Sequence, residues 1–235
     1  MLRALFFYLL FYPWTLLVLL TAIPSSLFGQ NVIHQIGILW GRSCLFLAGL
    51  KLRVEGTGNI PRDEPVIYVA NHQSNFDIPI LYAGLPIQFR WLAKKELFKV
   101  PLFGLAMKRS GYIPVDRSNR RKAMQSLTDA AKKVREGVSV IIFPEGTRTP
   151  DGSLQPFKKG ALLVAAKARV PVVPVVIHGS FRIQPKDSWR IRSGPLEMKI
   201  LPPIRTDGLQ HNEFDSLTTT IHDRIATSLQ EMADA

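Results

Sequence analysis

Residues 1–50 contain the longest apolar segments of the chain. No Asp, Glu, Lys or Arg occurs from Ala4 to Gly41, and residues 4–23 read ALFFYLLFYPWTLLVLLTAI. Twenty helical residues that rise about 1.5 Å each span about 30 Å, which is the thickness of a bilayer core. Aromatic side chains crowd the first half of this run, as is typical of segments at a membrane interface. The pattern predicts a helical membrane anchor over residues 1–50.

Three interpretations of this anchor stay open. A signal peptide would use Arg3 as its basic start, but the apolar run is long and no A-x-A cleavage site follows it. A second interpretation is a single span, or a hairpin that crosses the bilayer twice. The third is a helix–turn–helix that lies within one leaflet and turns near residues 24–26. Pro13, where we expect a kink or break in a helix, and Arg42 both favour the third interpretation.

From Lys51 onward, short apolar runs alternate with helical patterns, which is typical of an α/β layer fold. Several runs are continuous and β-branched, as in strands buried on both faces of a sheet. The expected strands are residues 50–54, 66–70, 89–93, 111–115, 138–143, 172–177 and 196–201. The expected helices are residues 77–83, 101–108, 120–136, 160–168 and 213–232. The predicted fold class is α/β, with a mixed, largely parallel central sheet of about seven strands flanked by helices, in one domain over residues 51–235.

The chain is basic, with 30 Lys and Arg against 18 Asp and Glu and a formal net charge of +12. An apolar content of 46% excludes long intrinsic disorder, and a lone cysteine, Cys44, excludes a disulfide-stabilised mini-protein. The basic excess leaves two classes: a nucleic-acid binder, or a protein of anionic membranes and anionic substrates. Residues 90–135 hold 13 of the basic and 3 of the acidic side chains, so the charge is concentrated away from the apolar anchor.

The first candidate for chemistry is the sequence NHQSNFD at residues 71–77, between an expected strand and an apolar helix. His72 and Asp77 cannot share one face deep within a helix, because five residues correspond to a rotation of about 500°. They can meet if His72 lies in the loop and Asp77 in the first helical turn, where Pro79 is tolerated. Asp77 could then orient one imidazole nitrogen while the other takes a proton from a hydroxyl group. The alternative is a helix cap beside an incidental histidine.

Three further blocks follow the first. FPEGTR, at residues 143–148, ends an expected strand, which is where α/β folds bind ligands. Arg148 offers a bidentate donor for a phosphate group, and Gly146 allows the backbone to approach a ligand closely. GYIPVDR, at residues 111–117, ends another strand with a charged pair, and VVPVVI, at residues 172–177, reads by itself as a core strand. The alternative for each block is an ordinary loop or strand.

In their order along the chain, the four blocks resemble those of the glycerolipid acyltransferase family, specifically the 1-acyl-glycerol-3-phosphate (lysophosphatidic acid) acyltransferases. The resemblance covers roughly residues 40 to 205 and includes AKKELFKVPLFG at residues 93–104. It implies that His72 is the general base and Asp77 its partner, and that no acyl-enzyme forms. It also implies a block of acceptor-phosphate residues, with Lys94 as an added phosphate or oxyanion contact, and three residues that line or support the acyl pocket. The phosphate residues are Arg117, Glu145, Gly146, Thr147, Arg148 and Lys94, of which Glu145 would orient an arginine or a hydroxyl group and would not touch the phosphate. The acyl-pocket residues are Val173, Pro174 and Val175.

The reaction that the resemblance implies moves a fatty acyl group from a thioester of coenzyme A or acyl carrier protein to the sn-2 hydroxyl of lysophosphatidic acid. The product would be phosphatidic acid, made at the inner (cytoplasmic) membrane with the active site on the cytosolic side. No cofactor and no metal are expected, because the histidines lack the spacing of metal ligands. The basic stretch would adhere to anionic membrane lipids, or dock an acidic carrier protein or the phosphates of coenzyme A.

Rival interpretations come from other classes of protein. A nucleic-acid binder has no need of an apolar anchor, and no nucleic-acid motif is present, so no nucleic-acid partner is expected. A basic membrane-surface scaffold without catalysis would not need intact blocks. A hydrolase would use the His–Asp pair to activate water. Within the family, the acceptor could be another lyso-lipid, either a lyso-amino-acid lipid or a lysophospholipid.

Overall fold

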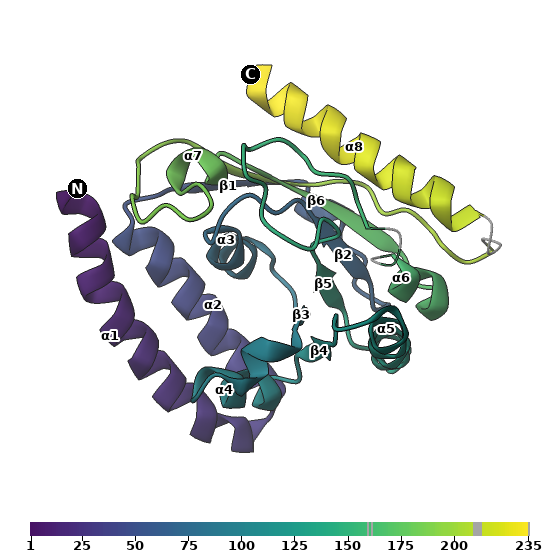
Figure 1. Cartoon of the computed structure of the whole chain (residues 1–235), viewed down its shortest axis with the longest axis horizontal. Coiled ribbons are helices and arrows are strands. Elements are labelled where there is room, and N and C mark those ends of the chain that lie inside the picture. The colour runs from purple at the N-terminus through teal and green to yellow at the C-terminus, as the bar shows by residue number, and fades with distance from the viewer. Residues whose placement is uncertain (159, 161, 209–212, 235) are drawn as a thin grey trace.

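The computed structural model describes residues 1–158, 160, 162–208 and 213–234. The N-terminal segment forms a helical hairpin, in which α1 (Leu2–Ser25) and α2 (Gln30–Leu47) lie side by side (Figure 1). The short 3₁₀ helix η1 (Ser26–Phe28) joins them. In the described part of the chain, residues 2–28 form the one helical segment long and apolar enough to cross a membrane, with a mean hydropathy of 2.0.

A kink or a break is expected at Pro13, and α1 runs through this residue without a break. A proline removes the hydrogen bond to the carbonyl four residues earlier, but a packed neighbouring helix helps to hold the two flanking turns in line. Here α2 packs along α1, and the Trp40 indole N–H donates to the Thr15 hydroxyl over 3.0 Å. The chain reverses instead at Gly29, whose φ of 107° lies in the region that favours glycine.

Seven strands form one sheet in the order β1-β7-β6-β2-β5-β3-β4. Neighbouring strands are parallel except for the antiparallel pair β6–β7, so the predicted mixed, largely parallel sheet is confirmed. Strands β2 and β5 are buried along their whole length, which explains their continuous apolar sequences. The strands are β1 (Leu52–Glu55), β2 (Ile67–Ala70), β3 (Arg90–Lys94), β4 (Ile113–Val115), β5 (Val140–Ile142), β6 (Val172–His178) and β7 (Leu196–Ile200).

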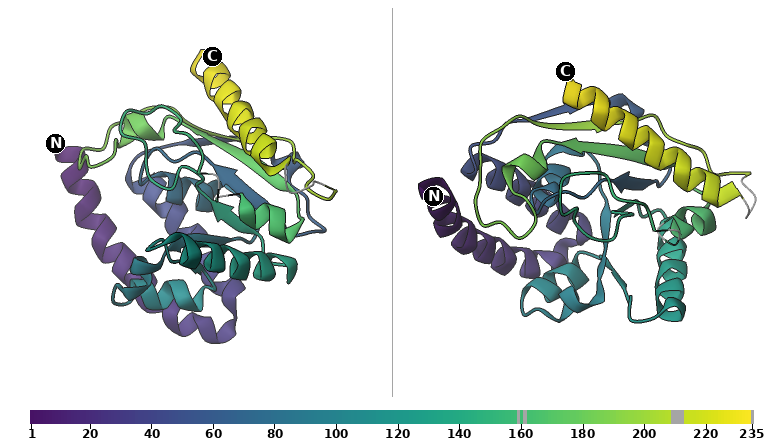
Figure 2. Two further views of the ribbon diagram at one scale, coloured as in Figure 1. Left: turned by 45° about the vertical axis from the view of Figure 1, so that its right-hand side comes forward. Right: turned by 45° about the horizontal axis from the view of Figure 1, so that its top comes forward.

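Helices cover both faces of the sheet (Figures 1 and 2). The α1–α2 hairpin and α3 (Asp77–Gly84) pack on one face, and α5 (Arg120–Arg135), α6 (Leu163–Ala168) and α8 (Phe214–Asp234) pack on the other. Because side chains alternate along a strand, each face has its own apolar cluster. The remaining short elements are η2 (Thr57–Asn59), η3 (Lys95–Lys99), α4 (Phe103–Arg109) and α7 (Ser180–Ile183).

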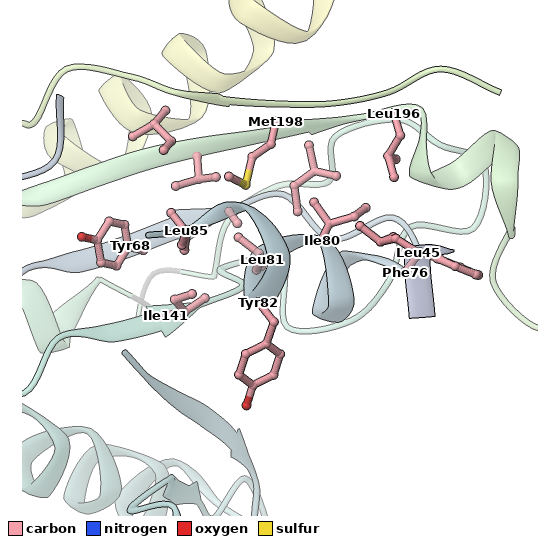
Figure 3. Packing of buried hydrophobic residues seen from close by; sticks show 14 of the residues in the cluster. Leu45, Tyr68, Phe76, Ile80, Leu81, Tyr82, Leu85, Ile141, Leu196 and Met198 are labelled. Atoms are coloured by element: carbon pink, nitrogen blue, oxygen red, sulfur yellow. The ribbon is translucent and has the colours of Figure 1, made fainter. Parts of the chain in front are cut away.

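Helix α2 belongs to the core of the molecule. Figure 3 shows Leu45 of α2 near Ile80 in the apolar cluster that also holds the buried residues of α3. The two helices approach closely, because a Cβ added to Gly41 would lie 2.7 Å from the Cβ atom of Tyr82. A Cβ added to Gly37 would lie 2.7 Å from the ring of the same tyrosine. The segments predicted as an anchor, 1–50, and a catalytic domain, 51–235, therefore share one core.

The expected elements differ from the observed ones mainly at their ends. The helix expected from residue 101 begins at Phe103, because Leu102 has a φ of 58°, which an α-helix cannot contain. The helix expected from residue 160 begins at Leu163, and residue 161 lies outside the described residues. Helix α7 is not predicted from the sequence, because its four residues are too few for a helical pattern.

Candidate active site

Polar residues from four sequence blocks meet at one edge of the sheet. His72 follows β2, Lys94 ends β3, Arg117 follows β4 and Glu145 follows β5. Because these four strands are parallel to one another, their carboxyl ends lie at the same edge, where open α/β sheets bind ligands. The sheet therefore brings together residues that are more than seventy positions apart in the chain.

His72 and Asp77 form a hydrogen-bonded pair. His72 lies in the loop after β2 and Asp77 is the first residue of α3, which is the arrangement that their spacing predicts. The His72 Nδ1 atom lies 2.8 Å from Asp77 Oδ2. The same oxygen accepts the backbone N–H groups of Gln73 and Ser74 over 2.7 and 2.8 Å. The carboxylate is completely buried at a helix N-terminus, where the helix dipole favours negative charge.

The other imidazole nitrogen of His72 is available for chemistry. Because a carboxylate can only accept hydrogen bonds, Nδ1 carries the proton and Nε2 is the basic nitrogen. No described residue forms a hydrogen bond with Nε2. The ring stacks on Phe143, with centroids 3.9 Å apart and planes 11° apart, and its side chain is 17% exposed. The pair can therefore remove a proton from a hydroxyl group that reaches Nε2.

A cavity of about 610 Å³ opens beside His72. Its walls come from α1, α2, α3, β3 and α4 and are largely aliphatic and aromatic. Phe7 of α1 packs near Phe76, next to the His–Asp pair, and the lining of α1 continues as far as Ala22. At about 1.5 Å per residue this part of α1 extends for about 20 Å. The cavity thus has the length and the apolar lining to hold a hydrocarbon chain, with His72 near one end.

Glu145 holds the His72 segment in place. It is almost completely buried, and its Oε1 atom accepts the backbone N–H of His72 over 2.6 Å. Its Oε2 atom accepts the backbone N–H of Gln155 over 3.1 Å. Burial, and secondly the charge of Asp77, raise the pKa of Glu145 to about 7, although the two backbone hydrogen bonds act in the opposite direction. The Glu145 side chain, which the sequence places in the phosphate block, therefore binds backbone N–H groups, one of them that of His72.

Arg117 and Lys94 bring positive charge to the cavity, and both line it. Arg117 Nη1 donates to the Gly146 carbonyl over 2.8 Å. Gly146 has a φ of 75°, which lies in the left-handed region that favours glycine. The predicted residues Arg117, Gly146 and Lys94 therefore line the same cavity as His72, and the two basic side chains are suited to bind an anion in it.

Other predicted site residues lie away from the cavity wall. Thr147 is exposed, and Arg148 Nη2 lies 3.6 Å from Asp187 Oδ1. The fully buried segment Val173–Val175, which includes Pro174, is in the middle of β6, and none of its three residues lines the cavity. Their register opposite β2, with Val175 beside Ala70, supports the strand that carries His72. Of the prediction that they line or support the acyl pocket, only a supporting role fits this position, because the walls of the cavity come from other elements, among them α1 and α2.

Several residues of the site are not singled out by the sequence. Phe143 packs on the imidazole, and its only signal is its place in the block FPEGTR. Tyr8 of α1 accepts a hydrogen bond from Gln184 Nε2 over 2.7 Å, and the Gln184 carbonyl accepts one from the Ser74 hydroxyl. These hydrogen bonds join α1 to the loop that carries His72. Tyr8, Ser74 and Gln184 are too far apart in the sequence for a local pattern to predict the contact.

Within the described residues, no three His, Cys, Asp or Glu side chains are grouped so that they could hold a metal ion.

A histidine oriented by a carboxylate, beside basic groups and an apolar cavity, is the arrangement expected of an enzyme that acts on an amphiphilic substrate with a reactive hydroxyl group. The chain belongs to the acyltransferase family, whose profile, described as "Acyltransferase", matches residues 51–178.

Relatives and a solved structure agree with the resemblance that the four blocks indicate. The 1-acyl-sn-glycerol-3-phosphate acyltransferase of Limnanthes alba is 33% identical, over 88% of this chain and 73% of its own length. The 1-acyl-sn-glycerol-3-phosphate acyltransferase alpha of Bos taurus is 33% identical, over 97% of this chain and 81% of its own. The crystal structure of the 1-acyl-sn-glycerophosphate (LPA) acyltransferase PlsC from Thermotoga maritima is 30% identical, with a TM-score of 0.84, and the match covers 100% of this chain and 96% of that one. The predicted family and fold are confirmed.

Proposed function

We propose that the protein transfers a fatty acyl group from an acyl thioester to the sn-2 hydroxyl of lysophosphatidic acid, giving phosphatidic acid for phospholipid biosynthesis. The observation that carries the proposal is the free Nε2 atom of His72, held by Asp77 at the end of a long apolar cavity. Relatives that bear the name of this activity cover most of the chain and support the choice of acceptor.

In the proposed reaction His72 Nε2 takes the proton of the substrate hydroxyl as its oxygen attacks the thioester carbonyl carbon. The tetrahedral intermediate then loses the thiolate, the C–S bond breaks, and the imidazolium returns the proton to the sulfur atom. The products are an ester and a free thiol, and no acyl-enzyme forms. Asp77 keeps the imidazole in the Nδ1–H tautomer and stabilises its charged form. Lys94, at the cavity wall, is the proposed donor to the oxyanion.

The acceptor phosphate is proposed to bind Arg117. This guanidinium lines the cavity, makes no ion pair among the described residues, and is fixed by its bond to the Gly146 carbonyl. Glu145 and Gly146 act as positioning residues, since Glu145 holds the backbone of His72 and Gly146 holds Arg117. Arg148 and Thr147 lie at the rim of the same loop, and Arg148 would need to leave Asp187 to reach a phosphate.

The acyl chain is proposed to lie in the cavity between α1, α2 and α3. Its donor is a thioester of coenzyme A or acyl carrier protein, each of which carries phosphate or carboxylate groups that suit the basic residues 90–135. The apolar outer face of α1 is proposed to sit in the cytoplasmic membrane, with the active site on the cytosolic side. A hairpin within one leaflet fits the packing of α2 into the core, because a crossing helix would be separated from the α/β part.

An acceptor panel tests the proposal. The purified protein in phospholipid vesicles is given a radiolabelled acyl thioester, first of coenzyme A and then of acyl carrier protein, with one lyso-lipid at a time. We expect label in phosphatidic acid when lysophosphatidic acid is present, and far less in the products of lysophosphatidylcholine, lysophosphatidylglycerol or a lyso-amino-acid lipid. Preferred transfer to any of these, or release of free fatty acid to water, would overturn the proposal.

Arg117→Ala belongs to the same experiment as a test of the phosphate site. Hydrogen bonds to charged groups are worth about 1.5–3 kcal/mol, so the KM for lysophosphatidic acid should rise by at least about tenfold. The KM for the thioester should change much less. The matched control is Arg121→Ala on α5, which removes an exposed arginine that does not line the cavity. Equal changes in the two Michaelis constants would argue against a phosphate role for Arg117.

A further inference from the structure

Most of the large apolar side chains that are exposed in the α/β part lie in one short segment. Of the seven that are exposed among the described residues after position 50, five lie between residues 97 and 105. They are 39–45% exposed, and they are Leu97, Val100, Leu102, Phe103 and Leu105. The other two, Met124 and Trp189, are isolated. Contiguous exposed apolar patches of this kind mark a surface that is covered in the working protein.

The backbone keeps this segment on the surface. Leu102 has a φ of 58°, which is costly for a leucine, between η3 and α4. Two close backbone bonds tighten the turn, from Phe103 N–H to the Pro101 carbonyl over 2.6 Å and from Gly104 N–H to the Val100 carbonyl over 2.7 Å. Phe98 of η3 and Gly104, Ala106 and Met107 of α4 are the buried residues of this segment and of the helix that follows it, and the five apolar side chains named above stay exposed beside them.

The 97–105 segment continues the apolar surface of the hairpin. Helix α4 contacts α1, and it lies beside the C-terminal half of α1 in the views of Figures 1 and 2. That half of α1 exposes Leu16, Leu17 and Leu20, each about half. Leu97 and Phe103 also line the cavity, so the segment lies at the edge of the proposed acyl site.

Basic side chains flank the segment on both sides. Lys94, Lys95 and Lys99 precede or lie within it, and Lys108 and Arg109 follow it, all of them exposed. Glu96 is the single acidic residue from 94 to 109. An apolar centre with a basic border complements a bilayer surface with anionic headgroups.

We propose that residues 97–105 form a second membrane-inserting element, which dips below the lipid headgroups beside α1 while Lys99, Lys108 and Arg109 contact anionic headgroups. The partner is the lipid bilayer itself. The molecule then has two adjoining contacts with the membrane, one from α1 and one from the 97–105 segment, and both elements line the cavity. A lipid substrate can then reach the cavity from the bilayer.

Site-specific labels test the insertion directly. Val100→Cys and, as the matched control, Met124→Cys are made in a Cys44→Ala background and labelled with an environment-sensitive fluorophore. Met124 is 39% exposed on α5, outside the patch, and neither labelled position lines the cavity. In vesicles of phosphatidylglycerol and phosphatidylcholine, we expect lipids brominated along the acyl chain to quench the label at residue 100 but not that at residue 124. Quenching of both labels only by aqueous iodide would show that residue 100 stays in water and would overturn the proposal.

A charge variant gives a second, independent measurement. The double variant Val100→Asp/Leu105→Asp should partition into the same vesicles at least about tenfold more weakly than the wild type, because two apolar side chains no longer insert. Met124→Asp should bind like the wild type. A circular-dichroism spectrum in detergent shows that the variants are folded. Unchanged binding by the folded double variant would contradict the proposal, whatever the outcome of the acceptor panel.

Discussion

At the scale of single residues, hydrogen bonds to two buried carboxyl groups hold the His72 loop in place. Asp77 takes three hydrogen bonds on one oxygen, from the imidazole and from two backbone N–H groups. Glu145 holds the same loop by accepting the backbone N–H of His72. Two buried carboxyl groups therefore act on one histidine, one through its ring and one through its backbone.

Glu145 makes stability depend on pH. Its pKa is raised from an ordinary 4.5 to about 7 in the folded protein, mainly by burial. Between these values the folded state binds more protons than the unfolded state, so the free energy of unfolding should fall as pH rises from about 4.5 to 7. Above this window the contribution is constant. Glu145→Gln cannot ionise and should lose this slope.

Urea unfolding in detergent at a series of pH values measures this difference. The glutamine can accept only one of the two backbone bonds, so the variant is expected to be less stable by an offset that does not depend on pH. Identical slopes for the wild type and Glu145→Gln between pH 5 and 7 would show that Glu145 is not the group responsible.

At the scale of elements, the strands and long helices follow from local sequence and the role of the hairpin does not. The continuous apolar runs at residues 66–70 and 172–177 predict buried strands, because both faces of these strands must be apolar. The apolar composition of residues 4–23 equally predicts a membrane helix, but it says nothing of which side faces α3. That orientation depends on the fit of glycines on α2 to Tyr82, which only the packed molecule provides.

Gly41→Ala tests the packing of α2 on α3. The added methyl group would lie 2.7 Å from Tyr82 Cβ and 2.9 Å from the Pro79 carbonyl oxygen, so one helix must move. Overpacking of this kind costs about 1–3 kcal/mol of unfolding free energy, and the Tm should fall by several degrees. Gly194→Ala is the matched control, because nothing lies within 4 Å of its added Cβ. An equal Tm for both variants would contradict the close approach of α2 to α3.

Ala22→Phe tests the position of the acyl chain along α1. Ala22 is buried and lines the cavity at the end of α1 that lies away from Phe7. A larger side chain there should shorten the space, so that transfer from long-chain thioesters falls while transfer from shorter ones is kept. Leu20→Phe, on the exposed face of the same helix turn, is the control. A uniform loss of activity across chain lengths would place the acyl chain elsewhere.

At the scale of the whole molecule, the sheet turns a linear order of motifs into one site. The four blocks can be recognised from the sequence, and their positions after expected strands predict that they meet at one sheet edge. The sequence does not distinguish side chains that face the cavity from those that support it. Arg117 faces the cavity, whereas Glu145 and Val173 do not contact it, because loop geometry and strand register decide these directions.

We propose that His72 acts as the base in direct acyl transfer to lysophosphatidic acid. The most direct measurement is the initial rate of phosphatidic acid formation from a labelled acyl thioester and lysophosphatidic acid, by the wild type and by His72→Ala. General-base catalysis contributes about 10²–10⁴-fold, so the variant should lose that factor in kcat while its binding to vesicles and its Tm stay close to those of the wild type. A folded His72→Ala variant that forms phosphatidic acid at the wild-type rate would show that His72 is not the base.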